Sequence, residues 1–330
     1  MKLLVLGCGS IGTRHISNLR EIDSTLEIDV FDPKKQLRKD IQKKFQVNTF
    51  EHIPKNKSDY DLVLICTPPT SHIKLAIDSL QDGSNVFVEK PLSSNLIGIS
   101  KLRNIIKKND SLAFIGYNFR FNEGINLIKE LVTSKKLGKV LHASAYFGQY
   151  LPDWRPLQDY RKNYSFLKNL GGGIIHDSSH EIDYLCWILG KPISLQSDFV
   201  TSSTFKTNVE SLAEIILKFN GNVLANVHLD FIRREYKRSL ELLFENGIIN
   251  WSLKENKLNI FDVKKKTWNK IKTNGNINDM YVKEITHVLD CVKHNRKSKI
   301  IDIEYGLTSL MLSQLLIKAG KTGKRITLNK

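Results

Sequence analysis

The feature that most constrains this chain is a run of three closely spaced glycines near its start. The run reads Gly-Cys-Gly-Ser-Ile-Gly over residues 7–12, and it lies between an apolar segment at 2–6 and an amphipathic segment at 11–21. This is the GxGxxG pattern of dinucleotide-binding strand–loop–helix units. The first glycine permits the tight turn, the second lets the main chain approach a pyrophosphate, and the third lets helix and strand pack closely. Amide groups at the helix start donate to the phosphates. The residues that we assign to the cofactor here are Gly7, Gly9, Ser10, Ile11 and Gly12.

An aspartate follows the pattern at the distance that such a unit requires. Asp32 ends the second predicted strand, twenty residues after the last glycine, where a carboxylate accepts hydrogen bonds from the adenosine ribose hydroxyls. Its charge would repel a 2′-phosphate and therefore favours NAD. Lys34, Lys35 and Arg38 lie nearby and could offset that repulsion, so NADP stays open.

The order of apolar segments divides the chain into two domains. Short apolar runs alternate with segments of helical periodicity at first, which predicts a doubly wound parallel sheet, a Rossmann domain, over residues 1–120. Longer strands then follow one another without helices between them, and Asn-Gly pairs at 220–221 and 246–247 stand where hairpin turns are needed. A helix over 176–189 and two closing helices complete an α+β domain with a largely antiparallel open sheet over 121–330.

Composition narrows the class of protein and of ligand. The net charge is +16, but the lysines are spread along the chain without a basic stripe and interleaved aromatics, which argues against nucleic acid and favours an anionic small molecule. Apolar runs are far shorter than a membrane span, and the four cysteines show no paired or zinc-like spacing, so we expect a cytoplasmic protein without a metal site. A sheet with one face free of helices often pairs with a second copy, so we expect a homodimer or homotetramer.

Two further segments end predicted strands, where doubly wound sheets bind ligands. The first contains Thr67, Pro68 and His72, which we assign to the cofactor; a surface or helix-capping role for His72 is the alternative. The second contains Glu89 and Lys90, followed by a proline. There Lys90 would point into the crevice beside the nicotinamide and exchange a proton with a substrate oxygen. A solvated lysine paired with Glu89 is the other interpretation.

Several short motifs stand in a characteristic order along the chain. They are the glycine loop followed by His15, the Thr67-Pro68 loop, Glu89-Lys90-Pro91, the stretch Gly116-Tyr117-Asn118-Phe119-Arg120-Phe121, and Gly171-Gly172-Gly173 before a helix bearing Asp177 and His180. Taken together, they resemble the glucose–fructose oxidoreductase / inositol dehydrogenase family (Gfo/Idh/MocA). The resemblance covers essentially the whole chain.

The resemblance implies where the chemistry takes place. In that family the lysine of the Glu-Lys-Pro motif and the histidine of the glycine-introduced helix face the nicotinamide from opposite sides of the substrate. Lys90 and His180 would then be the catalytic pair of an NAD(P)-dependent oxidoreductase. A CH–OH group would lose its hydroxyl proton to one of them while its hydride passes to the nicotinamide. The family's helix carries an aspartate four residues before the histidine, a position that His176 holds here, with Asp177 one residue later. Asp177 is therefore a third catalytic candidate, and His176, which we also assign to the substrate, could replace either Asp177 or His180.

A polar, aromatic loop precedes the glycine run and suits carbohydrate recognition, because rings stack on sugar faces and Arg binds carboxylate or phosphate. Trp154, Arg155 and Tyr160 are its candidate substrate contacts, and a packing or interface loop is the alternative. Asn118 and Arg120, at the hinge between the predicted domains, are further candidates. The loop is similar to that of family members in surface-glycan and nucleotide-sugar pathways, which implies a sugar, sugar acid or nucleotide sugar as substrate.

Two other functions stay open. A non-catalytic NAD- or sugar-binding regulator could use the same fold, but it has no need of Lys90 together with His180. NAD-dependent glycoside cleavage, also run on this fold, would need a further acid or base near the leaving group, and Tyr160 or His176 could serve.

Overall fold

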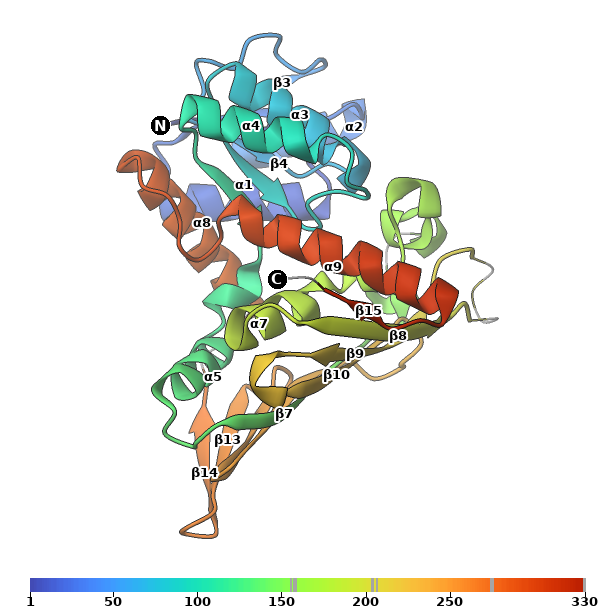
Figure 1. The fold of residues 1–330 in the computed structure, drawn as a ribbon. Coiled ribbons are helices and arrows are strands. Elements are labelled where there is room, and N and C mark those ends of the chain that lie inside the picture. The colour runs from blue at the N-terminus through green and yellow to red at the C-terminus, as the bar shows by residue number, and fades with distance from the viewer. Residues whose placement is uncertain (155, 157–158, 203–204, 206, 274–275, 329–330) are drawn as a thin grey trace. The chain divides into compact units, whose positions relative to one another are not determined.

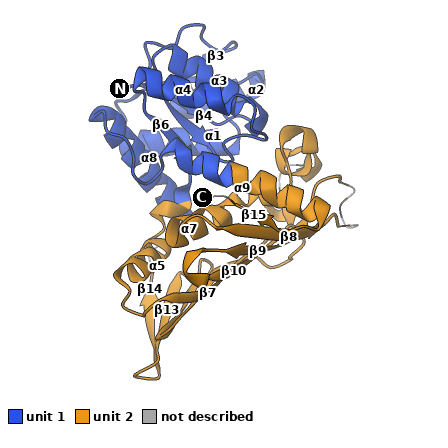
Figure 2. Cartoon of the chain, viewed as in Figure 1, with its two compact units in different colours: residues 1–118, 277–310 blue, residues 119–276, 311–330 orange. Residues whose placement is uncertain are grey.

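The contacts of the computed structural model divide the chain into two compact units (Figure 2). One unit comprises residues 1–118 and 277–310, and the other comprises residues 119–276 and 311–330. The sequence predicted a boundary near residue 120, close to the first of these limits, but it did not assign the segment 277–310 to the N-terminal unit. The structure describes every residue except 155, 157–158, 203–204, 206, 274–275 and 329–330.

The first unit is built on a six-stranded parallel sheet (Figure 1). The strand order β3-β2-β1-β4-β5-β6 changes direction between β1 and β4, which is where doubly wound sheets bind ligands. Every neighbouring pair is parallel, which confirms the predicted fold. β4 is wholly buried and β1 nearly so, as in a sheet that is covered on both faces. The strands are β1 (Lys2–Leu6), β2 (Glu27–Phe31), β3 (Asn48–Phe50), β4 (Leu62–Ile65), β5 (Asn85–Glu89) and β6 (Ala113–Gly116).

Helices connect these strands and cover the sheet. α1 packs against α8, and α3 packs against α4, so the covering helices form two pairs. Residues 303–310, the start of α9, belong to this unit as well. The helices are α1 (Ser10–Ile22), α2 (Lys35–Phe45), α3 (Pro69–Gln81), α4 (Ile99–Asn109), α8 (Ile277–Lys293) and α9 (Ile303–Thr322).

The second unit is built on a nine-stranded sheet in the order β14-β13-β12-β11-β7-β10-β9-β8-β15. All its pairs are antiparallel apart from β7 with β10, which confirms the predicted, largely antiparallel sheet. The predicted turn at 246–247 joins β11 to β12, and a 3-10 turn over Asn220–Asn222 joins β9 to β10. The strands are β7 (Val140–Gly148), β8 (Ser194–Val200), β9 (Leu212–Lys218), β10 (Leu224–Asp230), β11 (Lys237–Phe244), β12 (Gly247–Ser252), β13 (Lys257–Asp262), β14 (Thr267–Lys272) and β15 (Ile326–Thr327).

Three helices of this unit pack near the middle of the sheet. α7 contacts β7 and α5 (Glu123–Ser134), while α6 contacts β9 and β10. The sequence predicted one continuous helix over 176–189, and that prediction is wrong. The structure has α6 (Ile174–Asp177) and α7 (Ser179–Leu189), separated at Ser178, whose φ of −97° and ψ of 36° interrupt the helix.

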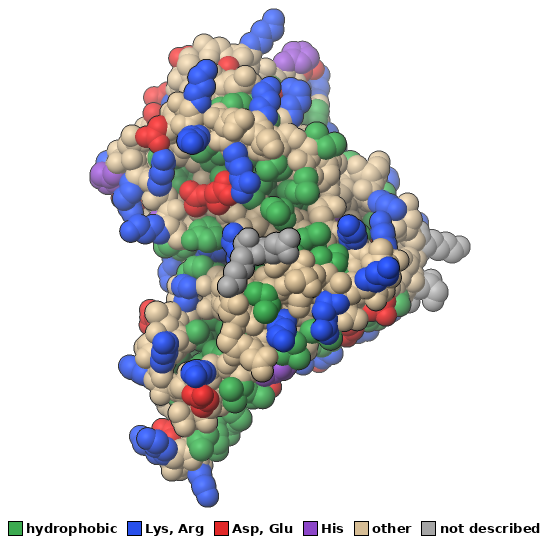
Figure 3. All heavy atoms as spheres, in the orientation of Figure 1, with side chains coloured by type: hydrophobic (Ala, Val, Ile, Leu, Met, Phe, Trp, Pro, Cys, Tyr) green, Lys and Arg blue, Asp and Glu red, His purple; other side chains and the backbone are tan. Residues whose placement is uncertain are grey.

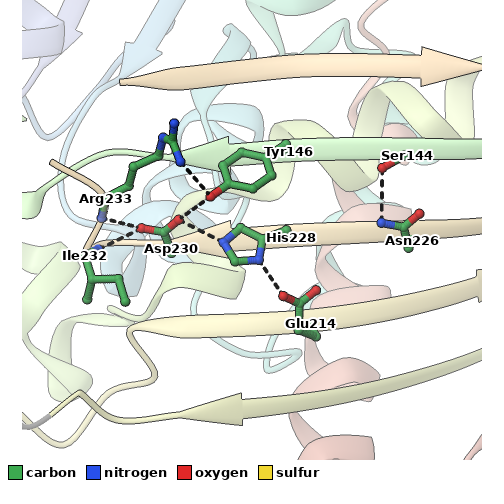
Figure 4. A network of polar contacts seen from close by, with 8 residues as sticks. All are labelled: Ser144, Tyr146, Glu214, Asn226, His228, Asp230, Ile232 and Arg233. Carbon is green, nitrogen blue, oxygen red and sulfur yellow. Dashed lines mark hydrogen bonds and ion pairs between the residues drawn. The ribbon is translucent and has the colours of Figure 1, made fainter. Parts of the chain in front are cut away.

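Polar side chains from neighbouring strands of this sheet form a network (Figure 4). His228 of β10 lies between two carboxylates, with Nδ1 2.5 Å from Oε1 of Glu214 and Nε2 2.9 Å from Oδ2 of Asp230. Its ring stacks on that of Tyr146 in β7, with 4.3 Å between centroids. Asp230 also accepts the backbone N–H of Arg233 at 2.6 Å. The network therefore links three adjacent strands.

The expected homodimer or homotetramer, formed through an open face of the sheet, stays a prediction.

Basic side chains are scattered over both units in the view of Figure 3 rather than gathered into one stripe. Among the described residues, no helix combines the length and the apolar content needed to cross a bilayer. Within the same part of the chain, His, Cys, Asp and Glu side chains form no group of three or more that could hold a metal ion.

Candidate active site

The phosphate loop has the geometry that its glycines predict. Gly7 has a φ of +92°, a conformation that favours glycine, and a Cβ at Gly12 would lie 1.9 Å from the Gly7 carbonyl oxygen. α1 begins at Ser10, with Gly9 as its N-cap. A Cβ at Gly9 would meet no heavy atom within 4 Å, so the loop leaves open space there, next to the amide groups of the helix start. This is the shape that a pyrophosphate requires, and the residues present therefore fit NAD.

Asp32 connects the end of β2 to this loop. One carboxylate oxygen accepts the N–H of Cys8 at 3.0 Å, and the other accepts the N–H of Lys34 at 2.8 Å. Of the three cations that could offset its charge, Arg38 is buried and donates to the carbonyl oxygens of Asp32 and Pro33 at 2.7 and 3.2 Å. Only Lys34 and Lys35 are exposed at this point. Lys34 and Lys35 are therefore the two cations that could offset the charge of Asp32 toward a 2′-phosphate.

His72 is neither a surface nor a capping histidine. Its ring is buried, with Nε2 2.7 Å from the carbonyl oxygen of Thr67 and Nδ1 3.0 Å from that of Pro91. Burial lowers the pKa of His72. Pro68 is the N-cap of α3, and the Thr67 hydroxyl lies 2.7 Å from that of Ser71. His72 therefore shapes the Thr67-Pro68 loop from within, which is an indirect contribution to cofactor binding.

Glu89 is the last residue of β5 and is buried. Its Oε1 lies 2.7 Å from Nε2 of His15, and its Oε2 accepts the backbone N–H of Lys90 at 3.1 Å. Lys90 is half-buried and precedes a cis peptide bond to Pro91. The carboxylate thus contacts the main chain of Lys90 and a histidine that the sequence had singled out only as part of a motif.

In the second unit, the residues that the resemblance points to are all buried. The ring of His180 lies 4.9 Å from that of Phe119, measured between centroids. The hydroxyl of Tyr164 donates to Oδ1 of Asp177 at 2.5 Å. Nε2 of His176 is 3.1 Å from the side-chain nitrogen of Gln314. Burial lowers the pKa of His176 to about 4, so its ring is neutral at physiological pH.

Two buried ion pairs involve residues of α7 just after His180. The Arg120 guanidinium donates to both oxygens of Asp183 at 2.9 and 2.8 Å, and both side chains are almost fully buried. Arg238 lies 2.8 Å from Glu181, which is also buried. The prediction that Arg120 contacts substrate is corrected here, because its guanidinium is inside the unit and paired with Asp183. Its role is to fix the helix that carries His180.

Aromatic side chains of the loop before the glycine run pack against other aromatic side chains of the second unit. Trp154 lies against Phe147 and Phe231, and its Nε1 donates to a carbonyl group within the loop at 3.2 Å. The ring of Tyr160 makes an edge contact with that of Phe166 at 5.5 Å. These contacts match the packing alternative for the loop. Arg155 lies outside the described residues.

Two further polar residues, Asn118 and Glu210, have buried side-chain oxygens without a hydrogen-bond partner among the described residues. Asn118, already a candidate, is buried, and its Oδ1 has no hydrogen-bond partner among the described residues. Glu210 carries no sequence motif and went unnoticed. A Cβ at Gly173 would lie 2.3 Å from Oε1 of Glu210, which explains the last glycine of the run before α6. Burial raises the pKa of Glu210, and only the fold brings it to this turn.

Comparison with known proteins agrees with this geometry. A family model described as an oxidoreductase family with an NAD-binding Rossmann fold matches residues 1–117, and a Gfo/Idh/MocA C-terminal domain model matches residues 125–250. The chain is 28% identical over 262 residues to the myo-inositol 2-dehydrogenase of Thermotoga maritima, which spans 76% of this chain and 74% of that protein. It is 25% identical over 245 residues to the glucose-6-phosphate 3-dehydrogenase of Bacillus subtilis, or 68% and 66% of the two chains.

A solved structure shows the same fold. A levoglucosan dehydrogenase in complex with NADH superposes with a TM-score of 0.91 at 13% sequence identity, covering 100% of this chain and 99% of that one. The parallel sheet and its phosphate loop define the class of protein, an NAD-binding oxidoreductase. More narrowly, the chain belongs to the Gfo/Idh/MocA family.

Proposed function

We propose that this enzyme transfers a hydride between the nicotinamide of NAD and a CH–OH group of a sugar, sugar acid or nucleotide sugar. The observation that carries the proposal is the place of Lys90, half-buried directly after β5 in a sheet of doubly wound topology. Ligands of such sheets bind at the carboxyl ends of the strands. The curated relatives named above are inositol and sugar-phosphate dehydrogenases, which supports a polyhydroxylated substrate.

The chain's own groups have complementary tasks in this reaction. NAD, when bound, accepts the hydride. The Lys90 ammonium donates a hydrogen bond to the substrate oxygen and stabilises the negative charge that develops there. His180 accepts the hydroxyl proton, so the C–H and O–H bonds are lost as a C=O bond forms. Asp177, which carries a charge close to His180 in sequence, is the group that we expect to favour the protonated imidazole.

The test is NADH or NADPH formation by the purified protein against free sugars, inositols, sugar acids and UDP-sugars. Lys90→Met should leave only a small residual turnover on the accepted substrate class and leave NAD binding intact. Lys101→Met, the same change at an exposed lysine of α4, is the matched control and should keep full activity. Tight NAD binding without turnover on any substrate would refute the proposal in favour of a regulator. Release of an aglycone without net NADH would refute it in favour of glycoside cleavage.

A further inference from the structure

We propose that two buried histidines of the first unit, His15 and His72, are positioning residues that fix the main chain on either side of Lys90. The inference rests on the proposed function, because it assumes that the Lys90 ammonium acts on the substrate. In this role, each histidine acts through the main chain that carries Lys90 and not through the Lys90 side chain.

His15 acts through Glu89. The carboxylate accepts twice, from Nε2 of His15 at 2.7 Å and from the N–H of Lys90 at 3.1 Å. Nδ1 of His15 is buried without a hydrogen-bond partner among the described residues. The hydrogen bond to Glu89 places a ring proton on Nε2. The two oxygens of the buried Glu89 carboxyl group therefore hold one histidine and one peptide group.

The residues around the His15–Glu89 pair pack against it and leave room for it. The His15 ring is fully buried, with Phe87 at 5.3 Å and Tyr281 at 6.0 Å, both in edge-on contact. A Cβ at Gly116 would lie 3.1 Å from Oε2 of Glu89, so this glycine of β6 leaves room for the carboxylate. A well-packed apolar pair of the same volume would stabilise the fold at least as well. Stability alone therefore gives no reason to place a charged group here.

The pair also links two parts of the cofactor site. His15 lies in α1, three residues after Gly12 and therefore in the helix whose first turn faces the phosphates. Glu89 ends the strand that presents Lys90. A displacement of the phosphate-binding helix would be transmitted through one short hydrogen bond to the residue before the catalytic lysine.

His72 holds the other side. Its ring spans from the carbonyl oxygen of Thr67 at 2.7 Å to that of Pro91 at 3.0 Å. A neutral imidazole has a single N–H, so His72 donates to one of these two carbonyl oxygens and packs against the other. The peptide before Lys90 is held by Glu89 and the residue after it lies against the buried His72 ring, so the Cα of Lys90 lies between two fixed points. A lysine side chain is long and flexible, so the position of its ammonium depends on that Cα.

His15→Phe tests the inference, because it keeps the aromatic packing and removes the hydrogen bond to Glu89. With the substrate found in the panel, kcat should fall about 10- to 100-fold, the loss expected from a misplacement of about 1 Å. The dissociation constant of NAD, measured by calorimetry on the same preparation, should change by less than about 3-fold. His15→Gln restores an N–H donor toward Glu89 and should recover a large part of kcat. His287→Phe, at a half-buried histidine of α8 that hydrogen-bonds to Ser298, is the matched control.

A double-mutant cycle separates positioning from general stability. In a Lys90→Met background, adding His15→Phe should have no further effect on residual turnover, because the positioned group is already gone. Additive losses, an equal loss in the His287→Phe control, or a parallel loss of NAD affinity would each overturn the inference. If His15→Phe fails to fold, the same cycle is run with Glu89→Gln, which keeps volume and removes the charge. Full activity of Lys90→Met alone would instead refute the proposed function.

Discussion

Replacing two glycines of the phosphate loop by alanine should produce opposite defects. At Gly12 the new Cβ would lie 1.9 Å from the Gly7 carbonyl oxygen, so one of two backbone segments must shift by roughly 1 Å. Overpacking of this kind costs about 1–3 kcal/mol of stability. At Gly9 the backbone is extended, with φ −65° and ψ −165°, and the Cβ meets nothing within 4 Å. The apo protein should therefore accept Gly9→Ala, with a gain of up to about 1 kcal/mol from reduced unfolded-state entropy.

The affinity for NAD should fall in Gly9→Ala, the variant whose stability is normal. The open space beside Gly9 is where the main chain must approach the pyrophosphate, so a methyl group there competes with the ligand. A penalty of about 1–3 kcal/mol corresponds to a loss of about 5- to 150-fold in NAD affinity. Gly9→Ala should thus have a normal or raised apo unfolding temperature and be stabilised less by NAD than the wild type.

Calorimetric unfolding of the apo proteins and titration with NAD measure both effects. The wild type and Gly83→Ala are the controls. Gly83 has open space around it but a φ of +95°, so the penalty of an alanine there is conformational only. The reasoning fails if Gly12→Ala unfolds at the wild-type temperature. It also fails if Gly9→Ala binds NAD with unchanged affinity, since the space beside Gly9 would then not be the phosphate site.

Three further perturbations have signs that follow from the structure. Asp32→Asn removes the charge and leaves one acceptor oxygen where the carboxylate has two, so kcat/KM with NADP should rise relative to NAD by about tenfold or more, and an unchanged ratio would contradict the assignment. Burial lowers the pKa of His228, but hydrogen bonds to its carboxylate partners outweigh burial and raise it overall. Its ion pairs are therefore fully formed below the ordinary histidine pKa and are lost as pH rises through the raised one. His228→Gln should remove about 1 kcal/mol of stability at pH 6, a small amount because Glu214 is exposed. The loss should be smaller at pH 9, where the ion pairs are no longer formed, and urea unfolding at both pH values checks this. Asp183→Asn leaves the Arg120 charge buried with a weaker partner and should cost about 3–5 kcal/mol, whereas a wild-type unfolding curve would show that the pair is not needed.

The cofactor half of the site could be predicted because its residues are set by local main-chain requirements. A glycine at position 7 follows from a positive φ, and Asp32 follows from the length of one strand–helix–strand unit. Such features depend on neighbours in sequence, so a single chain displays them. The same logic located Lys90 at a strand end. It did not reveal that His15 and His72 support that strand end, because their partners lie 74 and 19 residues away.

Elements without an apolar pattern were missed for a related reason. β3 has three residues, of which none is buried, and β14 has exposed lysines on a strand at the edge of its sheet. Neither shows the alternation on which strand prediction depends. The segment 277–310 follows the antiparallel strands in sequence, yet α8 packs on α1. The order of segments in the sequence therefore does not show that 277–310 belongs to the first unit.

Charged residues show the same limit. Arg120 and Asp183 are 63 residues apart and form a bidentate buried pair. In the sequence, an arginine next to an aromatic residue at a predicted hinge is indistinguishable from a ligand-binding arginine. Burial decides between the two roles, because a fully buried guanidinium with both donors used has no capacity left at that edge for a substrate.

The one-residue shortening before His180 has a physical explanation in the break at Ser178. On a continuous helix, a spacing of three would put Asp177 about 100° around the axis from the position that a spacing of four provides. α6 is a single turn that ends at Asp177, so the side chain is aimed by the loop and by Tyr164 rather than by the axis of α7. His176 at the family position is neutral, with a pKa of about 4, and it pairs with Gln314. A neutral imidazole cannot supply the negative charge that a protonated His180 requires. We therefore propose Asp177 as the better candidate for the family's carboxylate, because the interrupted helix frees its direction from the axis of α7.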